Sequence, residues 1–282
     1  MRLTEKTRTG RILPRRVVKI RFYAMAAIAM SFVLLAALAP YMAPYDPIAS
    51  DPAKSLTAPS VEHWCGTDRL GRDIFSRILC GAGNSFSMTF LMVILVSVIG
   101  TSIGLVSGYF GGIFDTVMMR LVDILLAFPD TVFAIAIAGM LGPGLPNTIL
   151  ALSLVSWTKY ARLTRSLTVS IRAKGYVTQA KFNGARTGKI LMKYILPNVA
   201  PQIVVLATMS VGGTMLSLAG LSFLGLASQP PTAEWGFMIY ESRQYIQTAP
   251  WMMIFPGIAL FITVVIFNLL GDNLRDYMDV KA

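Results

Sequence analysis

Long apolar runs without charged residues recur along this chain, and shorter polar segments separate them. A helix that crosses the hydrocarbon core of a membrane needs about 20 predominantly apolar residues. Runs that meet this need predict spans at residues 22–43, 84–108, 116–141, 148–168, 199–219 and 251–270. The third carries Arg120 and Asp123, which can pair on one helix face. A helical segment either ends or kinks at Pro129 and Asp130. The pattern therefore predicts an all-α membrane protein with six transmembrane helices.

The composition supports a membrane location. Of the 282 residues, 55% are hydrophobic and 14% are charged, whereas about a quarter of the residues in a soluble domain are charged. Most of the surface of this protein is therefore expected to face something other than water. This disfavours a soluble enzyme, a disordered protein and a disulfide-bonded scaffold.

Lysine and arginine are distributed unevenly between the predicted loops. The tail 1–21 has eight basic residues and one acid, and the segment 159–193 has nine basic residues and no acid. By contrast, 44–83 has four bases and five acids, and 221–250 has one base and two acids. Because basic residues flank spans on the cytoplasmic side, both basic segments and the C-terminus are predicted to be cytoplasmic. The predicted order is a cytoplasmic basic tail (1–21), a first span (22–43), an extracytoplasmic segment (44–83) and a five-span core (84–282).

The net charge of +11 is also typical of proteins that bind nucleic acids. The basic residues lie beside apolar spans rather than on a polar helix or sheet, so we expect them to fix orientation next to membrane lipid. No nucleic-acid partner is predicted.

Few residues of this chain are of the kinds that catalyse reactions or bind metals. Cys65 and Cys80 could form a disulfide in an oxidising compartment, although cysteines in apolar surroundings are more often free and buried. His63 is interpreted as an ordinary loop residue rather than a metal ligand. The sequence contains no phosphate-binding loop, no G-x-S-x-G and no H-E-x-x-H motif. We therefore predict no catalytic residue, no metal site and no cofactor in this chain.

Charged residues also mark the two predicted extracytoplasmic segments. Helical spacing pairs Arg69 with Asp73 and Asp68 with Arg72, either as solvated ion pairs or as part of a surface that contacts a partner. Residues 221–250 contain several Gly, Pro and aromatic residues, which suits a scoop or re-entrant element. Its two acids, Glu234 and Glu241, are expected either to be solvated or to attract cationic cargo.

The most informative cytoplasmic segment is 166–198, between the fourth and fifth predicted spans. Its pattern predicts short helices broken near Gly184 and Ala185, with their basic residues towards water or lipid headgroups. Helices this short are marginal alone, so they require a partner surface. From the residues alone, the partner surface could be either a second protein or the inner leaflet of the membrane.

Within this segment, Y-V-T-Q-A-K-F-N-G-A and I-L-P-N resemble the EAA motif of permease subunits of ABC importers. In that family the motif forms coupling helices that dock onto ATP-binding subunits. Thr178 and Gln179 replace its leading Glu-Ala, and Tyr194 stands where His is common. The resemblance implies an ATPase-coupling role for Tyr176, Val177, Ala180, Gly184, Ala185, Ile195, Leu196, Pro197 and Asn198.

The resemblance extends over nearly the whole chain. G-T-D-R-L-G-R-D-I-F-S-R-I, G-Y-F-G-G, M-R-L-V-D-I-L-L-A-F-P, L-S-F-L-G-L, P-P-T-A-E-W-G and F-N-L-L-G-D-N-L-R-D occur in family order. They are similar to motifs of the second permease of oligopeptide, dipeptide and nickel importers. This implies the type I (MetI-like) importer permease fold in the cell inner membrane. It also implies a homologous second permease, two ATP-binding subunits that hold ATP and Mg, and an extracytoplasmic solute-binding protein.

The implied function is ATP-driven import by alternating access. The cargo is left open between nickel, free or chelated, and di- or oligopeptides. An intramembrane enzyme and a channel are the alternatives from other classes. An intramembrane enzyme would need facing carboxylates or a set of metal ligands inside the bilayer. A channel would conduct ions without ATP.

Overall fold

The computed structural model describes residues 4–6 and 12–279, and helices dominate it. A short antiparallel pair of strands, β1 (Thr4–Lys6) and β2 (Ile12–Pro14), precedes the first helix. Three basic residues of the predicted tail, Arg2, Arg8 and Arg11, lie outside the described residues. Apart from the strand pair, the all-α prediction is confirmed for the described part of the chain.

Ten α-helices and three short turns of other helix types follow one another in the described residues. They are α1 (Arg15–Met42), the 3-10 turn η1 (Pro52–Lys54), α2 (Ile74–Phe110), α3 (Gly112–Leu126), α4 (Asp130–Leu141), α5 (Leu145–Arg172), α6 (Gly175–Phe182), α7 (Thr187–Lys189), the π-helical turn η2 (Ile190–Ile195), α8 (Leu196–Phe223), α9 (Trp235–Ser242), the 3-10 turn η3 (Arg243–Tyr245) and α10 (Trp251–Asp279).

Four of the described helical units are long and apolar enough to cross a membrane. They are α1, α2, the continuous rod of α7, η2 and α8, and α10. The bent pair of α3 and α4 counts as a fifth if it crosses as one unit. Helix α5 has 28 residues and corresponds to the remaining predicted span, but it carries Lys159, Arg162, Arg165 and Arg172 and does not pass the same criterion. The six predicted spans are consistent with these five units together with α5.

The predicted third span is two helices rather than one. Helix α3 ends at Leu126, α4 begins at Asp130, and the two are bent by 93°. Pro129, in an extended conformation, precedes α4 as its N-cap. Proline has no N–H and its ring clashes with the preceding turn, so it does not continue α3. The break expected at Pro129 is therefore confirmed, and a single straight span is not formed.

Helix α2 begins at Ile74, ten residues before the predicted start of the second span. Asp73 caps it, since its Oδ2 accepts hydrogen bonds from the backbone N–H of Ser76 at 2.8 Å and from the Ser76 hydroxyl at 2.7 Å. An aspartate at this position satisfies N–H groups that have no partner inside the helix. The sequence prediction placed the start inside the uncharged run, whereas the helix continues outward through Arg77.

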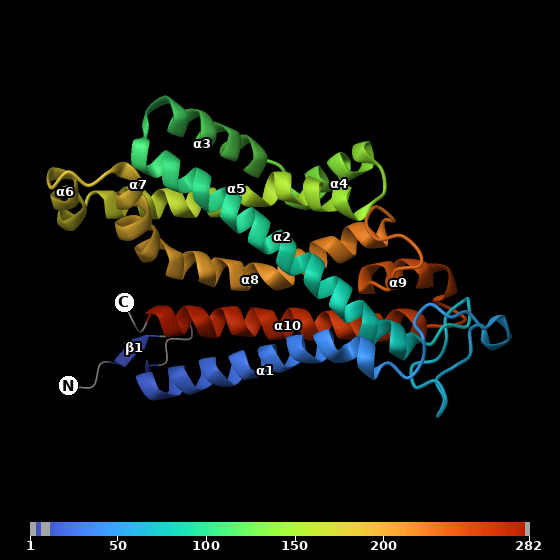
Figure 1. The fold of residues 1–282 in the computed structure, drawn as a ribbon. Coiled ribbons are helices and arrows are strands. Elements are labelled where there is room, and N and C mark those ends of the chain that lie inside the picture. The colour runs from blue at the N-terminus through green and yellow to red at the C-terminus, as the bar shows by residue number, and fades with distance from the viewer. Residues whose placement is uncertain (1–3, 7–11, 280–282) are drawn as a thin grey trace.

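The long helices lie roughly along one direction (Figure 1). Helices α1 and α10 lie side by side, α8 packs against α10, and α5 lies beyond α8, while α2 crosses between them and contacts all four. The start of α1 and the end of α10 lie at the end that carries α6 and α7. The opposite end carries residues 43–73 and α9. The basic segments at 12–21 and 159–193 thus lie towards the same end of the molecule.

Helices α2 and α5 approach closely because three glycines of α2 face α5. A Cβ on Gly100 would lie 2.4 Å from the carbonyl oxygen of Trp157, and one on Gly104 would lie 2.5 Å from that of Ala161. The third, Gly108, continues the spacing of four residues and meets α5 one turn further along. Small residues at this spacing let membrane helices pack backbone to backbone.

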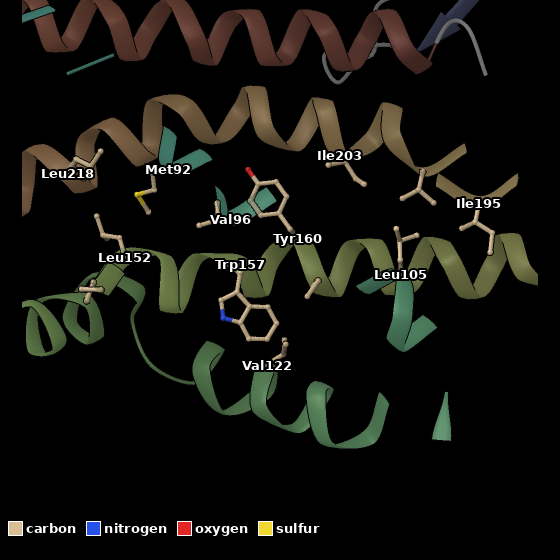
Figure 2. Close-up of a cluster of buried hydrophobic side chains, with 14 of the residues drawn as sticks. Met92, Val96, Leu105, Val122, Leu152, Trp157, Tyr160, Ile195, Ile203 and Leu218 are labelled. Atoms are coloured by element: carbon tan, nitrogen blue, oxygen red, sulfur yellow. The ribbon is translucent and has the colours of Figure 1, made fainter. Parts of the chain in front are cut away.

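Two apolar clusters form the core. The first joins α2, α5 and α8 (Figure 2), and its members include Met92, Val96, Leu105, Leu152, Trp157, Tyr160, Ile195, Ile203 and Leu218. The second joins α1, α2, α9 and α10, and its members include Ala36, Phe86, Trp235, Met252 and Phe267. Between them the clusters hold every long helix in place around α2.

Candidate functional site

The coupling segment, residues 166–198, contains one separate short helix, α6. The second predicted short helix is wrong, because its residues begin the continuous rod of α7, η2 and α8. Helix α6 ends at Phe182, and Gly184, which has φ +75°, follows its C-cap residue Asn183. The N–H of Gly184 donates to the Lys181 carbonyl at 3.0 Å, and the N–H of Ala185 donates to the Ala180 carbonyl at 3.1 Å. This pair of bonds is a Schellman motif, in which glycine is preferred because it adopts the left-handed conformation without strain. Gly184 therefore ends α6, and a Cβ there would meet no atom of the chain within 4 Å.

The nine predicted coupling residues do not share one surface. Val177, Ala180 and Ile195 are buried in the chain itself. Ala185 and Leu196 are half-buried. Tyr176, Gly184, Pro197 and Asn198 are exposed. The buried members anchor the short helices to the bundle, and only the exposed ones are available to a partner.

Sequence reasoning missed the most exposed apolar side chains of this segment. Phe182 at the end of α6 is 86% exposed, and Met192 is also exposed. Phe182 borders a groove of about 860 Å³ that Tyr109, Phe110, Val177 and Ile190 also line. The signal was present, since Phe182 is the only phenylalanine of the segment.

Two basic side chains, Arg172 and Lys181, line this groove, and other basic side chains lie elsewhere in the coupling segment. Lys181, Arg186, Lys189 and Lys193 are all exposed, as predicted. Arg172, at the end of α5, donates a hydrogen bond to the carbonyl of Tyr109 at the end of α2. This bond joins the ends of the two helices beside α6, so the coupling segment is attached to a fixed base.

Three ion pairs join α5 to α3 and α4, and we call them the α5 ion-pair row. They are Lys159–Asp130, Arg162–Asp123 and Arg165–Asp115. In the third pair the guanidinium binds both carboxylate oxygens at 2.6 Å. The predicted pairing of Arg120 with Asp123 is wrong, because Asp123 binds Arg162 across the helix–helix contact. Each lone charge at the centre of a membrane helix costs about 2.5–3.5 kcal/mol on insertion, which explains why the row is paired.

A second group, the outer charge cluster, lies at the other end of the molecule and comprises Asp68, Arg69, Arg72, Arg77 and Glu241. Arg72 binds Asp68 at 2.6 Å, as the spacing predicted. Glu241 of α9 receives Arg72 at 3.2 Å and Arg77 at 3.0 Å. The expected solvated pairs are wrong for this site, because Arg72, Arg77 and both acids are almost completely buried.

The predicted pairing of Arg69 with Asp73 is also wrong. Arg69 lies 3.5 Å from Glu241. Asp73 caps α2 and contacts Nδ1 of His63 at 2.9 Å through Oδ1. His63 is a loop residue, as predicted, and its side chain is buried. Spacing along one helix did not reveal these contacts, because His63 and Asp73 lie ten positions apart in a loop and Glu241 belongs to α9.

Residues 221–250 form a packed element rather than an exposed loop. Helix α9 lies against α8, α10 and α2. Trp235 is buried and its indole N–H donates to the Ile78 carbonyl at 2.9 Å. Glu234 is buried and caps α9, with its carboxylate accepting from the N–H groups of Gly236 and Phe237 at 2.8 Å. Neither Glu234 nor Glu241 is therefore an exposed acid.

The described residues contain no group of three or more His, Cys, Asp or Glu side chains placed to hold a metal ion. Cys65 and Cys80 are both free. Burial, and to a lesser extent the nearby Asp73 carboxylate, raises the pKa of the Cys65 thiol to about 11. This thiol is protonated and poorly reactive near neutral pH.

Comparison with known proteins shows which family this chain belongs to. Residues 100–281 match the family described as the binding-protein-dependent transport system inner membrane component. The chain is 43% identical over 251 residues to the dipeptide transport system permease protein DppC of Alkalihalophilus pseudofirmus, covering 89% of this chain and 83% of that protein. It is 43% identical over 246 residues to the nickel transport system permease protein NikC of Escherichia coli K12, covering 87% and 89%.

A third relative is the glutathione transport system permease protein GsiD of Escherichia coli O6:K15:H31, with 43% identity over 262 residues, or 91% of this chain and 86% of that protein. Among solved structures, an inward-facing conformation of the MetNI methionine ABC transporter has a TM-score of 0.56 at 21% identity, and covers 71% of this chain and 95% of that chain. This likeness shows a common fold. The chain belongs to the binding-protein-dependent inner-membrane permeases of ABC importers, and within them to the peptide and nickel family.

Proposed function

We propose that this chain is the second membrane permease of an ATP-driven importer that works by alternating access. Its partners are a homologous permease, two ATP-binding subunits that hold ATP and Mg, and an extracytoplasmic solute-binding protein. The chain itself carries no cofactor and is not an enzyme. The observation that carries this proposal is the coupling segment, where exposed Phe182 and four basic side chains project from helices anchored by buried Val177, Ala180 and Ile195.

The proposed orientation places the coupling segment and both termini in the cytoplasm, and residues 44–83 outside. The common location of the described basic segments at one end of the bundle supports this orientation. The proposed coupling residues remain Tyr176, Val177, Ala180, Gly184, Ala185, Ile195, Leu196, Pro197 and Asn198, to which we add Phe182.

The proposed cargo is nickel, free or chelated, or a di- or oligopeptide. The names of the relatives cited above refer to dipeptide, nickel and glutathione transport. An intramembrane enzyme is not proposed, because each of the three acids of the α5 ion-pair row binds a base rather than another acid.

The coupling proposal is tested with Phe182→Ala in the importer assembled with its partner subunits. An exposed aromatic side chain that enters a partner pocket contributes about 2 kcal/mol or more to binding, which corresponds to about 30-fold. We expect the variant to insert normally, because Phe182 is 86% exposed in this chain. We also expect it to retain the ATP-binding subunits about 30-fold less well and to lose ATP-driven uptake.

Met140→Ala is the matched control, since Met140 is 89% exposed but lies at the C-terminal end of α4, away from the coupling segment. It should leave subunit retention and uptake unchanged. A Phe182→Ala importer that retains its ATP-binding subunits and accumulates cargo as the unaltered importer does would refute this coupling site.

A further inference from the structure

A small cavity with a partly polar, partly apolar lining lies where α2, α4, α5 and α8 meet. Its volume is about 180 Å³, which is room for about six water molecules at about 30 Å³ each. It lies close to the middle of α5 and of α8, along helices whose outer faces are apolar. A partly polar space at this depth is not needed for packing, since the apolar cluster beside it already joins the same helices.

Two rows of polar side chains line the cavity. One is on α5 and consists of Ser156, Lys159 and Tyr160, and the other is on α8 and consists of Ser210, Thr214 and Ser217. Spacings of three and four residues put each row on one face of its helix. Ser210 and Ser217 donate to carbonyls of their own helix, at 2.7 Å and 3.0 Å. Their oxygen lone pairs therefore remain available as acceptors towards the cavity.

The cavity contains both members of one ion pair, Asp130 of α4 and Lys159 of α5. Their side chains are 31% and 55% exposed, although Lys159 lies at the middle of the 28-residue helix α5. Lipid does not solvate charges exposed to this extent, so this side of the cavity must face water or another protein chain. An importer with two permeases provides such a place, which is the passage between them.

Tyr160 adds a hydrogen-bond donor to the same wall. Its side chain points from α5 towards α8 (Figure 2). Its hydroxyl is buried close to the Ser210 hydroxyl, but it forms no hydrogen bond of standard geometry with any described residue. A buried hydroxyl normally makes at least one such bond, so that of Tyr160 is available to Ser210 or to an occupant of the cavity.

We propose that this cavity is a binding site for the charged groups of a small zwitterionic cargo as it crosses the membrane. The inference rests on the function proposed above. An ammonium group of the cargo binds the Asp130 carboxylate, and a carboxylate of the cargo binds the Lys159 ammonium group and the Tyr160 hydroxyl. The internal ion pair is exchanged for two pairs with the cargo, so no charge is left without a partner at this depth.

The same residues disfavour a bare metal cation as the occupant. Lys159 places a positive charge in the cavity, and Asp130 is its only acid. The remaining polar groups are hydroxyls, whereas nickel in proteins is bound mainly by imidazole and other nitrogen or sulfur ligands. A metal that enters with its charge masked by a carboxylate chelator is compatible with the site.

Thiol modification in the assembled importer tests this site. Cys65→Ser and Cys80→Ser remove the native thiols, and Thr214→Cys then places one thiol in the cavity. Leu154→Cys is the control, because Leu154 is exposed on α5 but does not line the cavity. A charged, water-soluble methanethiosulfonate reagent is applied without ATP, either alone, with the dipeptide Ala-Ala and the binding protein, or with NiCl2 and the binding protein.

We expect the reagent to modify Thr214→Cys about tenfold faster than Leu154→Cys. We also expect Ala-Ala to slow the modification of Thr214→Cys by about tenfold, and NiCl2 to leave its rate unchanged. Equal rates at the two positions, or a Thr214→Cys rate that Ala-Ala leaves unchanged, would overturn the site. Protection by NiCl2 instead of Ala-Ala would overturn its assignment to a zwitterion. ATP is absent from this experiment, so its outcomes do not depend on uptake. If the unaltered importer, supplied with ATP, takes up no cargo, that result counts against the proposed function and not against this binding site.

A double variant separates cargo binding from a purely structural ion pair. Asp130→Asn with Lys159→Met removes both charges, so neither is left buried without its partner. If the pair only holds α4 to α5, uptake of Ala-Ala should recover relative to Lys159→Met alone. We expect uptake to stay about tenfold below the unaltered importer, while Lys159→Arg retains most of it. Recovery in the double variant would contradict the proposal.

Discussion

Two groups of ion pairs in this chain use the same chemistry in opposite surroundings. In the outer charge cluster, the side chains of Arg77 and Glu241 are 1% and 8% exposed. In the α5 ion-pair row, those of Arg162 and Asp123 are 52% and 56% exposed. The outer cluster joins α2 to α9, and the row joins α5 to α3 and α4.

The difference in burial separates a structural role from an interaction role. Four members of the outer cluster are too buried to reach a partner, and only Arg69, whose side chain is 45% exposed, is open to solvent. Removing one of the four buried members leaves the others without compensation, so their effect is internal. A pair in the row is open on one side, and exposed pairs contribute about 0–1 kcal/mol to stability. The row is therefore better placed to meet a partner chain or a cargo than to hold the fold together.

The largest effect is expected from Glu241→Ala. This change leaves Arg72 and Arg77 buried with only Asp68 to balance them, and breaking a buried pair in this way costs about 3–5 kcal/mol. The expected result is a large loss of thermal stability of the purified chain in detergent. Asp123→Asn is the matched variant in the row and should change the free energy of unfolding by less than about 1 kcal/mol. Equal destabilisation by the two changes would remove the distinction drawn above.

The second effect concerns the contact that positions α5, and hence the row. Gly104→Leu places a side chain against backbone atoms of α5, including the Ala161 carbonyl, and backbone atoms cannot rotate away. Overpacking of this kind costs about 3 kcal/mol, and we expect it to separate α2 from α5 and abolish uptake. Gly139→Leu is the control, because a Cβ on Gly139 meets nothing within 4 Å. A Gly104→Leu chain as stable and active as this control would show that the close approach is not required.

These two regions also show how far the sequence could predict the structure. The helices were predictable because each consists of an apolar run that can be recognised locally, and the break at Pro129 follows from the chemistry of one residue. The pair Asp68–Arg72 was predictable because both residues lie four apart in the same segment. The coupling segment was predicted with its break at Gly184 for the same local reason.

The partners of the remaining charges were not predictable from local spacing. Glu241 binds Arg77 across 164 positions of the chain, and Asp123 binds Arg162 across 39. Local spacing favours the nearest opposite charge, so it paired Asp123 with Arg120. The glycines of α2 were visible at a spacing of four, but only the structure shows which helix they meet.

The smallest effect is a change in the reactivity of Cys65, which probes the outer region without disrupting it. Since burial raises the pKa of this thiol to about 11, its thiolate fraction should rise about tenfold for each pH unit between pH 7 and pH 9. The measurement is the rate of labelling of Cys65 in intact cells by a membrane-impermeant maleimide, in a Cys80→Ser chain. A rate that levels off near pH 8.5, the ordinary range of a cysteine, would mean that residues 43–73 open and expose the thiol. Labelling only after the cells are broken would place this end of the bundle, and the outer charge cluster with it, in the cytoplasm.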